Sequence, residues 1–241
     1  MSVDGRIVVV AGATSSSGVA TSRALIAAGA RVVAVGSNVE RLRAFERSVD
    51  GAATRVCDLS KLAAVTELAS SVSREFGAVD GLIHLVGGWR GAAGITAQSD
   101  DDWAAMESGF TTLRNTSRAF FDSLVASEAG RLAIVSSTSV DRPTAGGASY
   151  TAAKAAAESW VRSVADGFRR EHSVNKTAPV PQRAAAVRFS IMALVDDDMQ
   201  RDNPEKSYTG FTHVDALGQA VVGLWQGEAA EFNDARISLI P

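Results

Sequence analysis

A tyrosine and a lysine lie four residues apart in an alanine-rich segment, at Tyr150 and Lys154. Residues four apart share one face of a helix, so the ammonium group can lie beside the phenol. A free phenol has a pKa near about 10, too high for proton transfer at neutral pH, but a neighbouring cation favours the phenolate. The pair is a candidate acid/base centre, with a surface tyrosine packed over a lysine stem as the alternative. The preceding segment Ser136–Ser139 supplies hydroxyl groups that could reach the same site and bind a substrate carbonyl.

Small residues are concentrated directly after the first hydrophobic run of the chain. Glycines and hydroxyl side chains fill this segment, at Gly12, Thr14, Ser15, Ser16, Ser17 and Gly18. A helical pattern follows, and the free N–H groups and dipole of a helix N-terminus attract phosphate, which small residues allow to approach the backbone. We therefore expect these six residues to bind the pyrophosphate of a dinucleotide, with an ordinary tight turn as the alternative.

The end of the second hydrophobic run indicates which dinucleotide binds. It reads Gly36-Ser37-Asn38 and contains no acidic residue. An Asp or Glu at this point hydrogen-bonds the ribose 2′-hydroxyl and repels a 2′-phosphate. Its absence favours NADP over NAD, with Ser37 and Asn38 as contacts. Arg41 could serve the phosphate or simply face solvent.

The third hydrophobic run ends in an acidic residue, at Asp58-Leu59. The carboxylate could cap the next helix or hold the adenine amino group, and the two roles can coexist. We therefore include Asp58 and Leu59 among the expected cofactor contacts.

Seven short runs rich in Val and Ile alternate with longer segments of helical period. Continuous hydrophobicity is typical of strands that are buried on both faces of a parallel sheet. The alternation predicts an α/β fold, a Rossmann-type doubly wound parallel sheet with helices on both faces, in a single domain over residues 1–241. The expected strands are Arg6–Ala11, Arg31–Gly36, Ala53–Cys57, Gly81–Val86, Arg131–Ser136, Ala184–Ser190 and Arg236–Ile240. The expected helices lie near 18–29, 38–48, 60–76, 101–127, 149–171 and 213–226.

Two stretches break the regular pattern, Glu171–Gln182 and Val195–Gly210. In open α/β sheets, ligands bind beyond the carboxyl ends of the strands. The second stretch leaves such an end, so we expect a substrate loop near residues 195–210, with a plain surface loop as the alternative.

Composition excludes several classes of function. The chain has 241 residues, a net charge of −3 and no cluster of Lys and Arg, which argues against a nucleic-acid groove or an anionic membrane surface. Cys57 is the single cysteine, and the three histidines are scattered, so no metal site is expected. No apolar run approaches the roughly 20 residues that span a bilayer, and no leader pattern opens the chain. We expect a cytoplasmic protein that acts on a small molecule.

Taken together, these residues are similar to the short-chain dehydrogenase/reductase family across nearly the whole chain. The family's catalytic Tyr and Lys fall on Tyr150 and Lys154, and its Ser, thirteen positions before the Tyr, falls on Ser137. The resemblance implies NAD(P)-dependent hydride transfer to or from a small carbonyl or alcohol. Tyr150 would exchange the proton, Ser137 would orient the substrate oxygen, and Lys154 would hold the nicotinamide ribose and lower the Tyr pKa. The resemblance also implies a homo-oligomer, a dimer or tetramer, because the family's helices corresponding to 101–127 and 149–171 form such contacts.

Four departures from the family pattern stand out. The second glycine of the cofactor loop falls on Ser15 or Ser16, and the Asn that completes the catalytic tetrad falls on Gly109. The Pro-Gly after the sixth strand is absent, and the family's Asn-Asn-Ala-Gly reads His84-Leu85-Val86-Gly87. We retain Gly87 of this last segment as a cofactor contact.

Two alternative functions remain open. Gly87-Gly88-Trp89 and the missing tetrad Asn are similar to the dihydropteridine reductase branch, in which case Trp89 could stack on a flat heteroaromatic substrate. A tryptophan packed under its own loop is the competing interpretation. The departures at Val86 and Gly109 would also suit a catalytically weak NADP-binding module.

Overall fold

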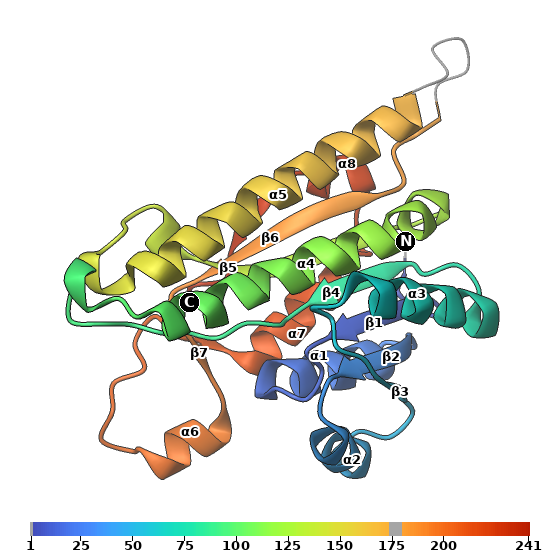
Figure 1. Cartoon of the computed structure of the whole chain (residues 1–241). Coiled ribbons are helices and arrows are strands. Elements are labelled where there is room, and N and C mark those ends of the chain that lie inside the picture. The colour runs from blue at the N-terminus through green and yellow to red at the C-terminus, as the bar shows by residue number, and fades with distance from the viewer. Residues whose placement is uncertain (1, 174–179) are drawn as a thin grey trace.

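A seven-stranded parallel sheet organises the chain in a computed structural model, which describes residues 2–173 and 180–241. All seven expected strands are confirmed, with ends that differ by a few residues, and they lie in the order β3-β2-β1-β4-β5-β6-β9 (Figure 1). Part of the irregular stretch 171–182 lies outside the described residues. The strands are β1 Ile7–Ala11, β2 Arg31–Gly36, β3 Ala53–Val56, β4 Gly81–His84, β5 Arg131–Ser137, β6 Ala185–Ile191 and β9 Arg236–Ser238.

Helices cover both faces of the sheet, as the alternation predicts. The six expected helices are α1 Ser16–Ala27, α2 Val39–Ser48, α3 Leu62–Phe76, α4 Asp100–Ala126, α5 Ala148–Ser173 and α7 Val214–Gly223. A further short helix, α8 Ala229–Phe232, precedes β9. Buried residues of α3, α4 and α5 belong to one hydrophobic core, and those of α1, α2 and α7 belong to the other.

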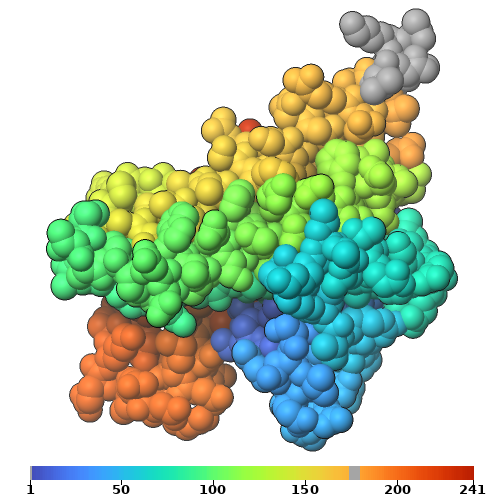
Figure 2. Space-filling model, in the orientation of Figure 1, coloured from blue at the N-terminus to red at the C-terminus, as the bar shows by residue number. Residues whose placement is uncertain are grey.

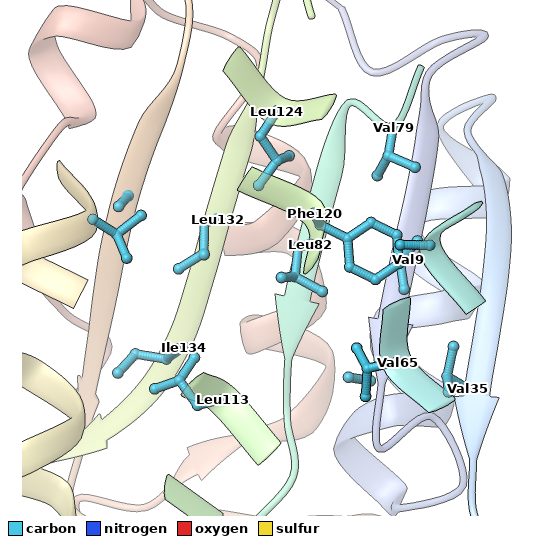
Figure 3. Packing of buried hydrophobic residues seen from close by; sticks show 14 of the residues in the cluster. Val9, Val35, Val65, Val79, Leu82, Leu113, Phe120, Leu124, Leu132 and Ile134 are labelled. Carbon is cyan, nitrogen blue, oxygen red and sulfur yellow. The ribbon is translucent and has the colours of Figure 1, made fainter. Parts of the chain in front are cut away.

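Alternate residues of the central strands β1, β2, β4 and β5 belong to opposite cores, which explains why hydrophobic residues follow one another in these strands. In β1, Val9 joins the core under α4, whereas Val8 and Val10 join the other core. Figure 3 shows Phe120 of α4 lying over Leu82 and Val9. The centre of the sheet is therefore covered by hydrophobic side chains on both faces, and the candidate catalytic side chains lie at or beyond the strand ends.

The strand order reverses beside β1, whose neighbours are β2 on one side and β4 on the other. Ligands of open parallel sheets bind at this kind of reversal, beyond the carboxyl ends of the strands. The loops after β1, β4, β5 and β6 therefore meet at one edge of the sheet.

The stretch 195–210 is more ordered than the expected loop. It begins within the two-residue strand β7 Leu194–Val195, which pairs with β8 Thr212–His213, and it contains α6 Asp197–Asp202. Asp196 caps α6 by accepting a hydrogen bond from Met199 N at 2.8 Å. Figure 1 shows this segment projecting from the body of the fold after β6.

Among residues 2–173 and 180–241, no helix has the length and apolar character needed to cross a membrane.

Candidate active site

The loop after β1 has the shape of a phosphate cradle, and two glycines are required to form it. Gly12 has a φ of +82°, and a Cβ added there would lie 3.0 Å from the backbone of Leu85 and Val86. A Cβ on Gly18 would lie 2.5 Å from the carbonyl oxygens of Gly12 and Ala13. No side chain fits at either position without moving the backbone.

A serine replaces the family's middle glycine without strain. Ser15 has a φ of −79°, which any residue adopts, and it caps α1. Its Oγ accepts a hydrogen bond from Gly18 N at 3.1 Å and donates one to Gly12 O at 2.9 Å. Ser16 and Ser17 begin the helix, where N–H groups lack intrahelical partners and are free to bind an anion.

The end of β2 presents polar groups beside this loop. Asn38 caps α2 by accepting a hydrogen bond from Arg41 N at 2.9 Å, and Ser37 is exposed. The Arg41 guanidinium reaches back towards the phosphate loop, with Nη2 3.4 Å from the carbonyl oxygen of Thr14. Arg41 is thus exposed to solvent and also lies next to the phosphate loop. Its position is compatible both with a residue that faces solvent and with a phosphate contact.

The turn after β3 leaves Asp58 exposed, with a fixed carboxylate. Its Oδ1 accepts hydrogen bonds from Ser60 N and Ser60 Oγ, at 3.0 and 2.7 Å, and these bonds lower the pKa of the carboxyl. Asp58 is not the cap of α3, whose N-cap residue is Lys61. Asn115 of α4 is buried and donates hydrogen bonds to the carbonyls of Leu59 and Ser60, both at 3.0 Å. Asn115 therefore holds this turn in place.

Ser137, Tyr150 and Lys154 lie together at the carboxyl edge of the sheet. Lys154 Nζ donates a hydrogen bond to Val135 O at 2.8 Å and lies 5.7 Å from the centroid of the Tyr150 ring. The hydroxyl of Ser137 is hydrogen-bonded to that of Tyr150 and accepts a bond from Ser139 N at 3.1 Å. The helix spacing and the strand end thus bring the three predicted side chains into one cluster.

Burial determines the proton affinities of this cluster. It lowers the pKa of Lys154 to about 8, although the charge of Glu158 acts in the opposite direction. It raises the pKa of Tyr150, and the hydrogen bond with Ser137 offsets only part of the increase. The expected lowering of the Tyr150 pKa is therefore wrong in direction, because burial outweighs the other effects. The phenol is protonated at neutral pH.

A buried histidine occupies the position of the first family Asn after β4. Thr112 Oγ1 donates a hydrogen bond to Gly109 O at 2.8 Å, so it accepts at 3.0 Å from His84 Nε2, which carries the proton. Burial, and then the charge of Lys154, lowers the pKa of His84 to about 3. The imidazole is therefore neutral beside the charged lysine.

The position of the missing tetrad Asn is open space. A Cβ on Gly109 would meet nothing closer than Gly87 Cα, at 3.8 Å. A Cβ on Gly87 would in turn lie 3.8 Å from Lys154 Nζ, so Gly87 adjoins the cluster, as expected of a cofactor contact.

Two cavities meet at Tyr150. The inner cavity, of about 460 Å³, runs from Ser15 and Ser17 past Gly87 to Lys154. The outer cavity, of about 780 Å³, is lined by Ser137 and Arg142, among others. Tyr150, Trp89 and Met192 border both cavities, and Trp89 is 67% exposed. Figure 2 shows a hollow between the blue lobe with α2 and the orange lobe with α6, below the green α4.

Sequence reasoning missed a set of buried charges next to the cluster. Glu158 and Arg188 are 8% and 7% exposed, and they approach each other at 3.5 Å. Two signals were available in the sequence. Glu158 follows Lys154 by four residues, and Arg188 interrupts an otherwise hydrophobic strand.

A parallel sheet with a phosphate cradle after β1 and a Tyr–Lys pair on α5 defines a nucleotide-dependent oxidoreductase. Residues 6–189 match the family model for short chain dehydrogenases. The chain belongs to this family, and it is an NAD(P)-dependent oxidoreductase that transfers hydride.

Several characterised proteins are similar to the chain. It is 29% identical to a 2,3-dihydro-2,3-dihydroxybenzoate dehydrogenase of Bacillus subtilis, over 64% of this chain and 61% of that protein. It is 28% identical to the NADP-dependent 3-hydroxy acid dehydrogenase YdfG of Escherichia coli K12, over 84% of this chain and 81% of that protein.

Solved structures share the fold. An NADPH-bound short chain oxidoreductase from Pseudomonas aeruginosa PAO1, described as containing an atypical catalytic center, has a TM-score of 0.83 at 20% identity and covers 97% of this chain and 95% of that one. A metagenomic short-chain oxidoreductase in complex with NADP has a TM-score of 0.77 at 25% identity, with 100% of both chains covered.

Proposed function

We propose that this chain transfers hydride between NADP(H) and a small carbonyl or alcohol, with Tyr150 exchanging the proton. One observation carries the proposal: Tyr150 borders both cavities, with Lys154 on the inner side and Ser137 on the outer side. A substrate in the outer cavity and a nicotinamide in the inner cavity would thus meet at the phenol. The proposal treats the chain as one dinucleotide-binding domain.

Each residue of the cluster has a distinct task. A bound nicotinamide supplies the hydride to a carbonyl carbon, or accepts it from an alcohol carbon. Tyr150 donates its proton to the carbonyl oxygen during reduction, and its raised pKa keeps that proton available at neutral pH. Ser137 orients the oxygen by a hydrogen bond. Lys154 uses one donor on Val135 O, so its other N–H groups can hold the nicotinamide ribose and stabilise the phenolate that remains.

Preference for NADP is supported by the groups around the end of β2. Ser37 is exposed there, and the Arg41 guanidinium lies against the phosphate loop, where a 2′-phosphate could bind both. The relative YdfG is named as NADP-dependent, whereas a xylitol dehydrogenase of the same fold is NAD+-bound. The remaining contacts proposed for the cofactor are Gly12, Thr14, Ser15, Ser16, Ser17, Gly18, Asn38, Asp58, Leu59 and Gly87.

The outer cavity favours a substrate that carries a negative charge. Two charged residues line it, Asp141 and Arg142. Asp141 is paired with Arg236 at 2.9 Å, whereas Arg142 has no ion pair within residues 2–173 and 180–241. A carboxylate on the substrate would supply the missing partner, and Trp89 and Met192 would contact its apolar part. We therefore place small keto or hydroxy acids first in the substrate class.

Turnover of a carbonyl panel with NADPH tests the proposal. Tyr150→Phe should lower kcat by about 10²–10⁴-fold and leave NADPH affinity unchanged, because only the proton donor is lost. Tyr208→Phe is the comparison variant, because it removes the chain's other tyrosine hydroxyl, which donates to Met199 O at 2.6 Å. Tyr208 lies in the expected substrate loop near 195–210, so this variant can change KM but should leave kcat near the wild-type value. Wild-type rates in Tyr150→Phe would show that another group supplies the proton.

The comparisons do not favour the pteridine or the binding-module hypothesis. A homo-oligomer remains part of the proposal, and it is supported by α4 and α5, which form the outer layer on one face of the molecule (Figure 1). Light scattering on the purified chain would give the oligomeric state directly. The cytoplasmic location stays a prediction.

A further inference from the structure

Two segments of the chain line the outer cavity side by side, and the side chain of Gln98 joins them. The segment 85–99 connects β4 to α4 and carries Trp89, whereas the segment 138–147 connects β5 to α5 and leads into Tyr150. Both segments line the outer cavity. Gln98 is half-buried at the end of the first segment, and the hydride-transfer scheme gives it no task.

Both ends of the Gln98 side-chain amide are hydrogen-bonded. Its Oε1 accepts from Ser149 N at 3.1 Å and from Ser149 Oγ at 2.6 Å. Its Nε2 donates to the carbonyl oxygen of Gly94 at 3.3 Å, and to those of Ala145 and Gly146 at 3.2 Å each. Only this orientation of the amide satisfies these partners, because a backbone N–H can only donate and a carbonyl can only accept.

The acceptor end of Gln98 lies at the first turn of α5. Backbone N–H groups at this point of a helix have no partner within the helix itself. Ser149 is the second residue of α5 and directly precedes Tyr150. Gln98 therefore fixes the start of the helix that carries the phenol.

A close backbone contact accompanies the bonds of Gln98. Ala92 N donates to Gly146 O at 2.9 Å, and this carbonyl also accepts from Gln98. A Cβ on Gly146 would lie 2.6 Å from Ala92 O, so only glycine permits the two segments to approach so closely. We call Ala92, Gln98, Gly146 and Ser149 the loop junction.

The position of Trp89 depends on how its own segment is held. The indole packs on that segment, since a Cβ on Gly91 would lie 2.3 Å from the Trp89 ring. Arg90 is paired with Asp102 of α4 at 3.7 Å, but exposed pairs of this kind contribute little. The bonds of Gln98 are therefore the main side-chain contacts that hold the segment of Trp89 against α5.

We propose that Gln98 is a specificity-determining residue: it holds the Trp89 segment against the start of α5 and thereby limits the width of the outer cavity. This inference rests on the proposed function, because it takes the outer cavity to be the substrate site. With the loop junction intact, the cavity favours a short keto acid beside Tyr150. Without the bonds of Gln98 the wall moves outward, so a short substrate is held less well and a bulky one fits better.

Steady-state kinetics with two substrates tests the proposal. Gln98→Met keeps the length of the side chain and removes its hydrogen bonds. The ratio of kcat/KM for a short aliphatic keto acid to that for a phenyl-substituted keto acid should fall about tenfold, as a net hydrogen-bond contribution of this order is lost. The affinity for NADPH should stay unchanged, because other residues form the inner cavity.

Gln182→Met is the matched control. Gln182 is also half-buried, and its Nε2 donates to Ala184 O at 2.9 Å just before β6, at the opposite edge of the sheet. This variant should keep the wild-type ratio even if its thermal midpoint falls. In Gln98→Met, an unchanged ratio or an equal fall of kcat/KM for both substrates would overturn the proposal and leave Gln98 with a structural role.

Amide hydrogen exchange tests the loop junction without substrate or cofactor. Gln98→Met should speed the exchange of Ser149 N–H, which loses its acceptor, and of Ala92 N–H, whose acceptor is Gly146, by about tenfold each. Wild-type exchange at Ala92 would contradict the proposal, since the two segments would then stay together without Gln98. Faster exchange at both amides without turnover of any carbonyl compound would refute the proposed function and still support the fastening role of Gln98.

A second variant serves if Gln98→Met does not fold. In Gln98→Glu the carboxylate still accepts from Ser149, but in its ionised form it cannot donate to Ala145 or Gly146. Exchange should therefore stay slow at Ser149 and become faster at Ala92, and the substrate ratio should fall. Slow exchange at Ala92 together with a wild-type ratio would overturn the proposal.

Discussion

Acid should destabilise this protein through one buried side chain, His84. The imidazole is buried and hydrogen-bonded to Thr112, and burial together with the charge of Lys154 lowers its pKa in the folded chain from 6.5 to about 3. In the unfolded chain the same group takes up a proton near its ordinary pKa. Between those two values the unfolded chain binds more protons than the folded chain, so stability falls as the pH falls from about 6.5 towards 3.

The size of the effect follows from the two pKa values. Between about pH 7 and pH 5, His84 should reduce the free energy of unfolding by about 2 kcal/mol, as one pKa unit corresponds to about 1.4 kcal/mol. The perturbation is His84→Asn, which keeps a polar side chain but does not titrate in this range. Urea unfolding at several pH values, followed by tryptophan fluorescence, measures the difference.

The two proteins are compared by how steeply the free energy of unfolding changes with pH. The absolute free energies are not compared, because His84→Asn also loses packing contacts at neutral pH. Between pH 7 and pH 5, the free energy of unfolding of His84→Asn should fall by about 2 kcal/mol less than that of the wild type. His213→Asn changes a histidine whose side chain is 31% exposed and keeps His84, so the part of the slope that comes from His84 should remain in this variant. Equal slopes in the wild type and His84→Asn would refute the view that His84 is held neutral by burial and by Lys154.

Two binding predictions concern the charges at opposite ends of the site. Arg41→Ala should weaken NADPH binding about tenfold and leave NADH binding little changed, as a charge-assisted contact to phosphate is lost. Arg43→Ala is the control for fluorescence titration, because Arg43 lies on the same helix but is paired with Glu40 at 2.6 Å; equal effects of the two variants would contradict the placement of the 2′-phosphate. Arg142→Gln should raise KM about tenfold for keto acids and not for neutral ketones in steady-state assays. A uniform rise would show that Arg142 does not recognise a carboxylate.

The sheet could be predicted from the sequence because its signal is local. Val8, Val9 and Val10 form a run that is typical of a strand buried on both faces, and β2 has a similar run. The phosphate loop could also be predicted from the sequence, because Gly12 and Gly18 follow the first strand. The helix α6 was not, since six residues capped by Asp196 are too few to show a helical period.

The features that could not be predicted from the sequence depend on how deeply a side chain is buried and on contacts between residues far apart in the chain. The direction of the Tyr150 pKa shift follows from burial, which no spacing of residues displays. Glu158 and Arg236 are 78 residues apart, and they meet because α5 packs on β6 while β6 pairs with β9. The substitution of Ser15 for glycine similarly needed the capping hydrogen bond to Gly18 before it could be understood.

The most direct test of the account is a structure of the chain with bound NADPH and a carbonyl compound. The account predicts the nicotinamide in the inner cavity, its ribose on Lys154, and the carbonyl oxygen within hydrogen-bonding distance of both Tyr150 and Ser137. A nicotinamide outside that cavity, or a substrate oxygen that contacts neither hydroxyl, would contradict it.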